Sequence, residues 1–200
     1  ALSLKHARNG RSWLYGASDL PERDIPRHGD LPMRLLARID LADVDATLPG
    51  SPWPKQGALH FFTAVDADGA PLLDEHFNPS ATRVVWSREA GSATPASVPS
   101  LAPRQALKVA VQKSELPDIG AAIVDAARLD DADLEAYRAW MEKSGRLDLA
   151  SGHRLGGYPT ILQHNDLEAR AALVAGEDAT QASRWRLLLQ LDSDDTCMWG

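Results

Sequence analysis

Apolar and polar residues alternate along several short segments of the chain, and this two-residue period predicts β-strands. In residues 34–41 the apolar side chains fall on every second position and the arginines and the aspartate fall between them, which predicts a strand with one buried face. Strands are also predicted at 58–65, where Phe61 and Phe62 make both faces partly apolar, at 83–86, and at 107–111, where the alternation recurs. Residues 66–69 (Asp-Ala-Asp-Gly) predict a turn after the second of these strands.

The second half of the chain changes to a helical period and predicts about three helices. The first begins at Ser114 and the second at Asp130 or Asp131, which serve as N-caps; the third begins at Asn165. Residues 19–32 follow neither period and are interpreted as a loop. Strands and helices do not alternate strictly, so we predict an α+β fold with a mostly antiparallel sheet, or sheets, in one domain spanning residues 1–200.

Two Leu-rich segments resemble each other. Residues 186–192 repeat the character of residues 34–40, with Arg, Leu, Leu and Asp at equivalent positions, and each segment follows a Gly- and Pro-containing element at 15–21 or 156–159. This pattern indicates an internal duplication with a pseudo-twofold arrangement. Leu-rich strands also resemble each other by chance, so the preceding loops decide between the two explanations: after a duplication they superpose as well.

The charge balance restricts the classes of partner. The chain has 28 acidic and 21 basic side chains and a formal net charge of -7, which repels phosphate backbones and disfavours nucleic acid as a partner. No apolar run approaches the length of about 20 residues that a membrane helix needs. The single cysteine, Cys197, rules out an intrachain disulfide and suits a reducing compartment. We therefore expect a cytoplasmic protein without a membrane or nucleic-acid partner.

Several segments carry a resemblance to a known family. Residues 155–159 (Leu-Gly-Gly-Tyr-Pro), 185–194 and 198–200 (Met-Trp-Gly) resemble the C-terminal half of the YwqG-like family, bacterial proteins grouped as a domain of unknown function. Residues 35–41 and 57–62 are similar to its N-terminal half. The resemblance implies that a further turn and an aromatic strand follow Trp-Gly, so we expect this chain to lack a C-terminal strand. It implies no established activity.

The candidate ligand-binding residues come from aromatic, glycine and acidic positions. Trp53 lies between two prolines, where an exposed indole would serve as a binding anchor, and Tyr15 belongs to the same aromatic set; core packing is the alternative for both. Asp40 and Asp192 occupy equivalent positions and either meet as an acid-base pair or accept backbone hydrogen bonds where their strands turn. The complete candidate set is Tyr15, Trp53, Gly156, Gly157, Tyr158, Asp40 and Asp192.

The sequence contains no motif that assigns a catalytic residue, a cofactor or a metal. It therefore favours a non-catalytic intracellular module that binds an unidentified protein or small molecule. The alternative hypothesis is a metal-assisted or hydrolase-like enzyme that uses His153, His164 and nearby carboxylates such as Asp166. That reading requires both histidines and a carboxylate to converge in one concave pocket.

Overall fold

The chain is organised as two compact units. The computed structural model describes residues 2–51, 53–72, 79–89, 98–111, 117, 121–143, 152–159 and 167–192. One unit, which we call the sheet unit, comprises Lys5–Ala110. The other, which we call the helical unit, comprises Ala1–Leu4 together with Val111–Gly200. The prediction of one domain over residues 1–200 stays a prediction.

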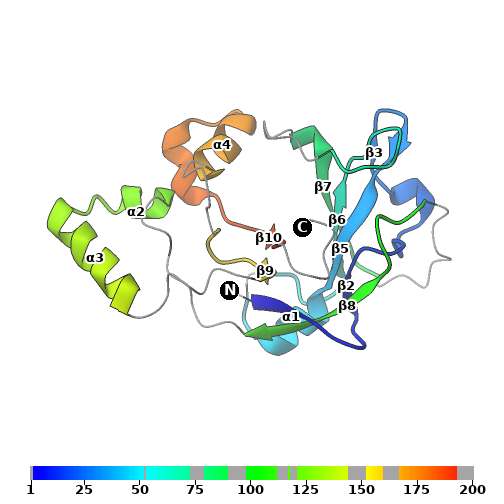
Figure 1. The fold of residues 1–200 in the computed structure, drawn as a ribbon, viewed down its shortest axis with the longest axis horizontal. Helices are drawn as coiled ribbons and strands as arrows, with labels where there is room; N and C mark the ends of the chain where they lie inside the picture. The colour runs from blue at the N-terminus through cyan, green and yellow to red at the C-terminus, as the bar shows by residue number, and fades with distance from the viewer. Residues whose placement is uncertain are drawn as a thin grey trace. The chain divides into compact units, whose positions relative to one another are not determined.

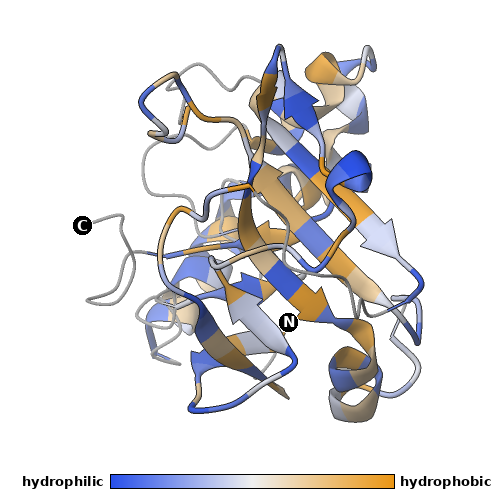
Figure 2. Ribbon diagram, turned by 90° about the vertical axis from the view of Figure 1, so that its right-hand side faces the viewer, coloured by the Kyte–Doolittle hydropathy of each residue, from blue (hydrophilic) through white to orange (hydrophobic). Residues whose placement is uncertain are grey.

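Five antiparallel strands form the core of the sheet unit, in the order β8-β2-β5-β6-β7 (Figure 1). Their bounds are β2 Ser12–Leu14, β5 Arg34–Asp40, β6 Ala58–Thr63, β7 Thr82–Ser87 and β8 Gln105–Val111. All six residues of β6 are buried, which confirms that both of its faces are apolar enough for a central strand. In the hydropathy view, hydrophilic residues interrupt the otherwise hydrophobic strands of this sheet (Figure 2).

Strand β5 differs from the expected half-buried strand because its polar face is also covered. Arg38 and Asp40 are 2 % and 4 % exposed. The segment after β2 supplies Leu20, Ile25 and Met33, which join Trp13 and Phe62 in one hydrophobic cluster beside this face. Residues 19–32 are therefore an ordered cover with its own elements, namely the 3-10 helix η1 (Glu22–Asp24) and the hairpin of β3 (Arg27–His28) and β4 (Leu31–Pro32).

The end of β5 was also wrong in the sequence-based prediction. Leu41 does not continue the strand but begins helix α1, Leu41–Thr47, directly after it (Figure 1). Asp40 acts as the N-cap, because its Oδ1 accepts hydrogen bonds from the backbone N–H groups of Ala42 and Asp43 at 3.1 and 3.4 Å. The predicted turn at 66–69 is confirmed, with Gly69 at a φ of 85°.

The described part of the helical unit contains three α-helices and short strands. The helices are α2 Ala122–Ala126, α3 Asp131–Lys143 and α4 Leu167–Val174, followed by the 3-10 helix η3, Ala179–Arg184. The cap of α3 is confirmed, since the Oδ1 atom of Asp130 accepts from the N–H of Asp133 at 2.9 Å. Ser114 and Asn165 lie outside the described residues. None of the described helices is long and apolar enough to cross a bilayer.

A three-stranded antiparallel arrangement completes the helical unit. Strand β9 (Arg154–Leu155) lies between β1 (Leu2–His6) and β10 (Leu189–Gln190). Residues 186–188, which the sequence placed in a strand, precede β10 and are not part of it. With the antiparallel sheet of the other unit and the helices, the fold class is α+β, as predicted.

The two units repeat one strand motif in the same register. Trp13 pairs with Arg38 and Leu14 with Ala37, and the second unit pairs Arg154 with Gln190 and Leu155 with Leu189. When residues 34–40 are aligned with 186–192, position 37 matches 189 and position 38 matches 190, so both units pair the equivalent positions. The flanking strands β8 and β1 agree too. Gln105 and Ala106 of β8 pair with Leu14 and Trp13 of β2. At the equivalent positions, Leu2 and Ser3 of β1 pair with Leu155 and Arg154 of β9.

The loops that follow β2 and β9 also share one backbone conformation. Tyr15 and Gly16 have φ values of 54° and 73°, and Gly156 and Gly157 have values of 69° and 83°. The N–H of Tyr15 donates to the carbonyl of Leu36 at 2.9 Å, and that of Gly156 donates to Leu188 at 3.0 Å. A shared register, a shared hydrogen bond and a shared left-handed turn support the duplication over chance similarity.

A glycine at the start of β6 provides a test of this sheet. Gly57 has a φ of 92°, and an added Cβ would lie 2.1 Å from the carbonyl oxygen of Ser87. We expect Gly57→Ala to lower the free energy of unfolding by about 2–4 kcal/mol, because backbone strain and a backbone clash add together. Urea denaturation measures this change.

The control for this experiment is Gly69→Ala. Gly69 has a φ of 85°, but no atom lies within 4 Å of an added Cβ, so only the strain remains and we expect a loss of about 1 kcal/mol. Equal losses in the two variants would contradict the close approach of β6 and β7.

Candidate functional site

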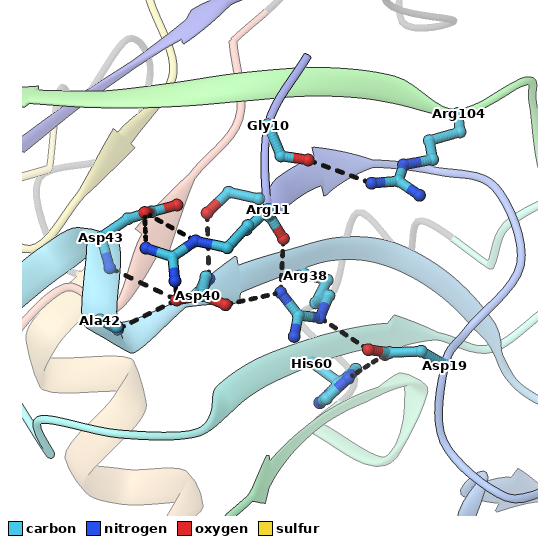
Figure 3. Close-up of polar contacts among 10 residues, drawn as sticks. Gly10, Arg11, Asp19, Arg38, Asp40, Ala42, Asp43, His60 and Arg104 are labelled. Atoms are coloured by element: carbon cyan, nitrogen blue, oxygen red, sulfur yellow. Dashed lines mark hydrogen bonds and ion pairs between the residues drawn. The ribbon is translucent and has the colours of Figure 1, made fainter. Parts of the chain in front are cut away.

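A buried arginine organises the polar face of the sheet unit. The Arg38 side chain on β5 is 3 % exposed, and its charge is matched by two carboxylates (Figure 3). Its Nε donates to Oδ2 of Asp19 at 2.9 Å, and its Nη1 donates to Oδ2 of Asp40 at 3.3 Å and to the carbonyl oxygen of Arg11. A buried guanidinium needs such partners, because an unpaired charge in the interior is strongly destabilising.

Asp19 extends this network to a buried histidine. Its Oδ1 lies 2.6 Å from Nε2 of His60 on β6, directly across from Arg38 in the sheet. Burial alone would raise the pKa of Asp19, but the hydrogen bond to His60 and the charge of Arg38 outweigh burial and lower that pKa below its ordinary value. The His60 side chain is 1 % exposed, so it does not present its imidazole to a substrate, and the Asp19–His60 pair attaches residues 19–33 to the sheet.

The opposite end of the network reaches the surface at Arg11. This side chain is 62 % exposed, and its Nε and Nη2 both donate to Oδ1 of Asp43 on α1, with an Nε–Oδ1 distance of 3.1 Å (Figure 3). Its Nη1 lies 3.8 Å from Oδ1 of Asp40. The network therefore runs from a fully buried imidazole to an exposed guanidinium, and its buried half is neutralised internally.

Trp13 connects the network to a second exposed arginine. The guanidinium carbons of Arg104 and Arg38 lie 3.8 and 4.6 Å from the centre of the Trp13 ring, which places both cations over the indole. The Nη2 of Arg104 also donates to the carbonyl oxygen of Gly10 at 3.1 Å. Arg104 is thus held in place although it is exposed.

Two open hollows adjoin these arginines at the turn between β1 and β2. Both are lined by Asn9 and Gly10 and have volumes of about 470 and 350 Å³. The larger one also takes its lining from α1 and β8. Together they carry four basic side chains, which are Arg8, Arg11, Arg104 and Lys108. We call this surface the basic groove.

Little negative charge opposes these cations. Asp43 is the one carboxylate among the described residues that line the basic groove. Arg8 and Lys108 are exposed and form no ion pair with the described part of the chain. The groove can therefore attract an anion, and Asn9 supplies an amide for hydrogen bonding.

The candidate residues of the sheet unit lie apart from the groove or beneath it. Tyr15 is fully buried and offers no ring surface to a ligand, whereas Trp53 is half-buried. Asp40 accepts two helix N–H groups and pairs with Arg38, as expected of an aspartate at a strand end. Its role as a ligand-binding residue stays a prediction, as does that of Trp53.

The candidate residues of the helical unit form a local hydrogen-bonded group. His153 is 3 % exposed, and its Nδ1 accepts the backbone N–H of Asp192 at 3.0 Å. The Asp192 carboxylate accepts the N–H of Gly152 at 2.6 Å. Gly156, Gly157 and Tyr158 form the half-buried left-handed turn after β9. His164, Asp166 and Cys197 lie outside the described residues, and within the described ranges no cluster of metal-ligating side chains occurs.

The sequence comparison gives a family for the whole arrangement. The profile of DUF1963, a domain of unknown function, matches residues 12–200. The chain belongs to the DUF1963 family. No curated protein matches its sequence. The family assignment therefore covers both units without naming a substrate or partner.

The basic groove of this DUF1963 chain was missed in the sequence-based prediction. The formal charge of -7 averages over the chain and hides a segment, residues 5–11 (Lys-His-Ala-Arg-Asn-Gly-Arg), that has no acidic residue. That segment was the available signal. Arg104 and Lys108 join it through the pairing of β2 with β8 and the contacts of residues 7–10 with β8, which the sequence does not reveal. The ion pairs of Asp19 depend likewise on the ordered cover, which was interpreted as a loop.

Asp19 is the residue through which the DUF1963 chain attaches its cover. We expect Asp19→Asn to cost about 3–5 kcal/mol of unfolding free energy, because Arg38 stays buried and loses one of its two carboxylates. Urea denaturation at neutral pH measures the loss. The control is Asp24→Asn in the same segment. Asp24 forms an ion pair with Arg23 in which both side chains are exposed, so we expect the free energy of unfolding to change by about 0.5 kcal/mol or less. A similar loss in both variants would contradict the role of Asp19.

The lowered pKa of Asp19 predicts a pH dependence with a definite sign. The stabilisation by Asp19 is fully present above the pKa of an unfolded aspartate, about 3.9, and is lost as the pH falls through the lower pKa of the folded state. The difference in unfolding free energy between the wild type and Asp19→Asn should therefore shrink on acidification from pH about 5 to pH about 2. A difference that stays constant over this range would show that the Asp19 carboxylate is not held by these charges.

Proposed function

We propose that this DUF1963 chain is a non-catalytic, intracellular binding module of the YwqG-like type that binds an acidic segment of a partner protein in the basic groove. One observation carries the proposal: four basic side chains gather around two adjoining hollows, and Asp43 is the one carboxylate among the described lining residues. The chain as a whole has a formal charge of -7, so this local excess of positive charge is opposite to the average surface.

The strand motif does not need the exposed arginine at position 11 in order to fold. In the second copy, Gly152 stands at the position of Arg11, yet the register and the left-handed turn are the same. Asp192 stands at the position of Asp40, and its carboxylate accepts a hydrogen bond from the backbone N–H of Gly152. Because one copy forms the motif without an arginine at this exposed position, the presence of Arg11 in the other copy supports a role in binding.

The form of the groove favours a peptide over a nucleic acid. Its hollows, of about 470 and 350 Å³, have room for a few side chains, and they lie beside the exposed backbone of a turn. A nucleic acid would extend its phosphates beyond the four cations and onto a surface whose net charge is negative like their own, where repulsion would oppose binding. An acidic peptide segment concentrates its charge over a short length and fits both conditions.

The test uses an oligo-glutamate peptide with an amidated C-terminus and a fluorescent label. We expect the double variant Arg8→Ala/Lys108→Ala to bind this peptide about 10-fold more weakly than the wild type, since it removes two cations that form no ion pair with the described residues. Fluorescence anisotropy at low and high salt measures the binding, which should weaken as the salt concentration rises.

The matched control is Lys55→Ala, which removes an exposed cation of the same unit outside the groove. This variant should bind like the wild type. A loss of binding free energy in Lys55→Ala that is half of the loss in the double variant would mean that the peptide senses only the net charge, because the control removes one cation and the double variant removes two. Absence of peptide binding, or tighter binding of an oligonucleotide of the same charge, would contradict the proposed function.

A further inference from the structure

Within the basic groove, one cation differs from the other three because a carboxylate already binds it. Arg11 directs Nε and Nη2 toward the same Oδ1 atom of Asp43. Arginine binds carboxylates in proteins through such pairs of N–H groups along one edge of its planar guanidinium. Asp43 is 28 % exposed and Arg11 is 62 % exposed, so the pair lies at the surface and a ligand in the groove can reach it.

Arg11 does not need Asp43 to stay in place. Its backbone carbonyl accepts a hydrogen bond from the buried Arg38, and its Nη1 lies 3.8 Å from Oδ1 of Asp40. Asp40 is fixed by Ala42 and by Arg38 and is 6 % exposed. The guanidinium therefore keeps a buried carboxylate nearby when Asp43 is replaced, and the negative charge of Asp40 continues to hold it at the groove.

We propose that Arg11 is the carboxylate-recognising residue of the basic groove and that Asp43 is a built-in competitor, which a side-chain carboxylate of the bound peptide displaces. This inference rests on the proposed function and adds the chemical group that the groove recognises. The exchange replaces one exposed ion pair by another of the same kind, so it needs little net energy. Lys108 lines the same hollow as Arg11 and Asp43 and can pair with a neighbouring carboxylate of the ligand.

The second copy of the strand motif agrees with this assignment. At the position of Arg11 it has Gly152, which has no side chain to offer, and the carboxylate of Asp192 is satisfied by the Gly152 backbone N–H. Its strands keep the same register. The exposed guanidinium and its pairing with α1 are therefore features of the sheet unit that the shared motif does not require.

The decisive experiment is a double-mutant cycle read out by anisotropy of the same amidated oligo-glutamate peptide. We expect Asp43→Asn to tighten binding about 3- to 5-fold, because the internal competitor is removed while the amide keeps the size of the side chain. Arg11→Gln should weaken binding about 5-fold or more. In the Arg11→Gln background, Asp43→Asn should bring less than half of the gain in affinity that it brings in the wild type, because its effect requires the Arg11 guanidinium.

The control is Asp45→Asn, which removes one negative charge from the same helix at a position that does not line the groove. It should leave the affinity nearly unchanged. An equal gain from Asp45→Asn, or an undiminished gain from Asp43→Asn without Arg11, would show a general charge effect and overturn the inference. If Asp43→Asn has no effect while Arg8→Ala/Lys108→Ala still weakens binding, the inference fails and the proposed function stands. If the peptide binds to none of these proteins, both fail.

Discussion

The guanidinium of Arg38 is the group on which the sheet unit depends. A buried positive charge must be compensated, and each compensating partner fixes a different part of the chain. Asp19 brings residues 19–33 over the polar face of the sheet, Asp40 is held where it caps α1, and the carbonyl of Arg11 is held directly before the start of β2. Trp13, paired with Arg38 across the strands, packs its ring beneath two guanidinium groups. One residue thus connects a cover, a helix and a turn.

The two copies of the strand motif show which parts of this arrangement follow from the backbone. Both have the same register, the same left-handed turn and the same use of an aspartate at the strand end. They differ in what fills the polar positions: Trp13 and Arg38 in one copy, Arg154 and Gln190 in the other. The N–H of Asp40 donates to the Ser12 hydroxyl, and that of Asp192 donates to the His153 imidazole. The constraint shared by both copies is therefore a hydrogen-bond acceptor at that position, which Ser12 supplies in one copy and His153 in the other.

Local signals predicted what depends on local structure. The two-residue period gave β5 and β6, the aspartate before an apolar stripe gave α3, and the repeat of Leu-rich segments gave the equivalence of β5 and β10. Long-range contacts could not be predicted in this way. Arg38 and Asp40 alternate with apolar residues as exposed positions do, and only the cover at 19–33 makes them interior. Leu41 continues the apolar alternation, but Asp40 caps a helix there, because a cap and a strand end share the same residue types. The groove needs β2 beside β8, which no pattern along the chain encodes.

The close packing of the turn explains why a groove at the surface can be specific. An added Cβ on Gly10 would lie 2.3 Å from the carbonyl oxygen of Leu107, so the turn approaches β8 as closely as a glycine allows. Arg104 is tied to the same glycine through its carbonyl and rests on Trp13, which Arg38 supports from within. The position of the exposed Arg104 guanidinium is therefore set by the packing of backbone and core. Side chains held in this way lose less conformational entropy when they bind a ligand than mobile surface lysines do, and such preorganisation favours selective binding by few charges.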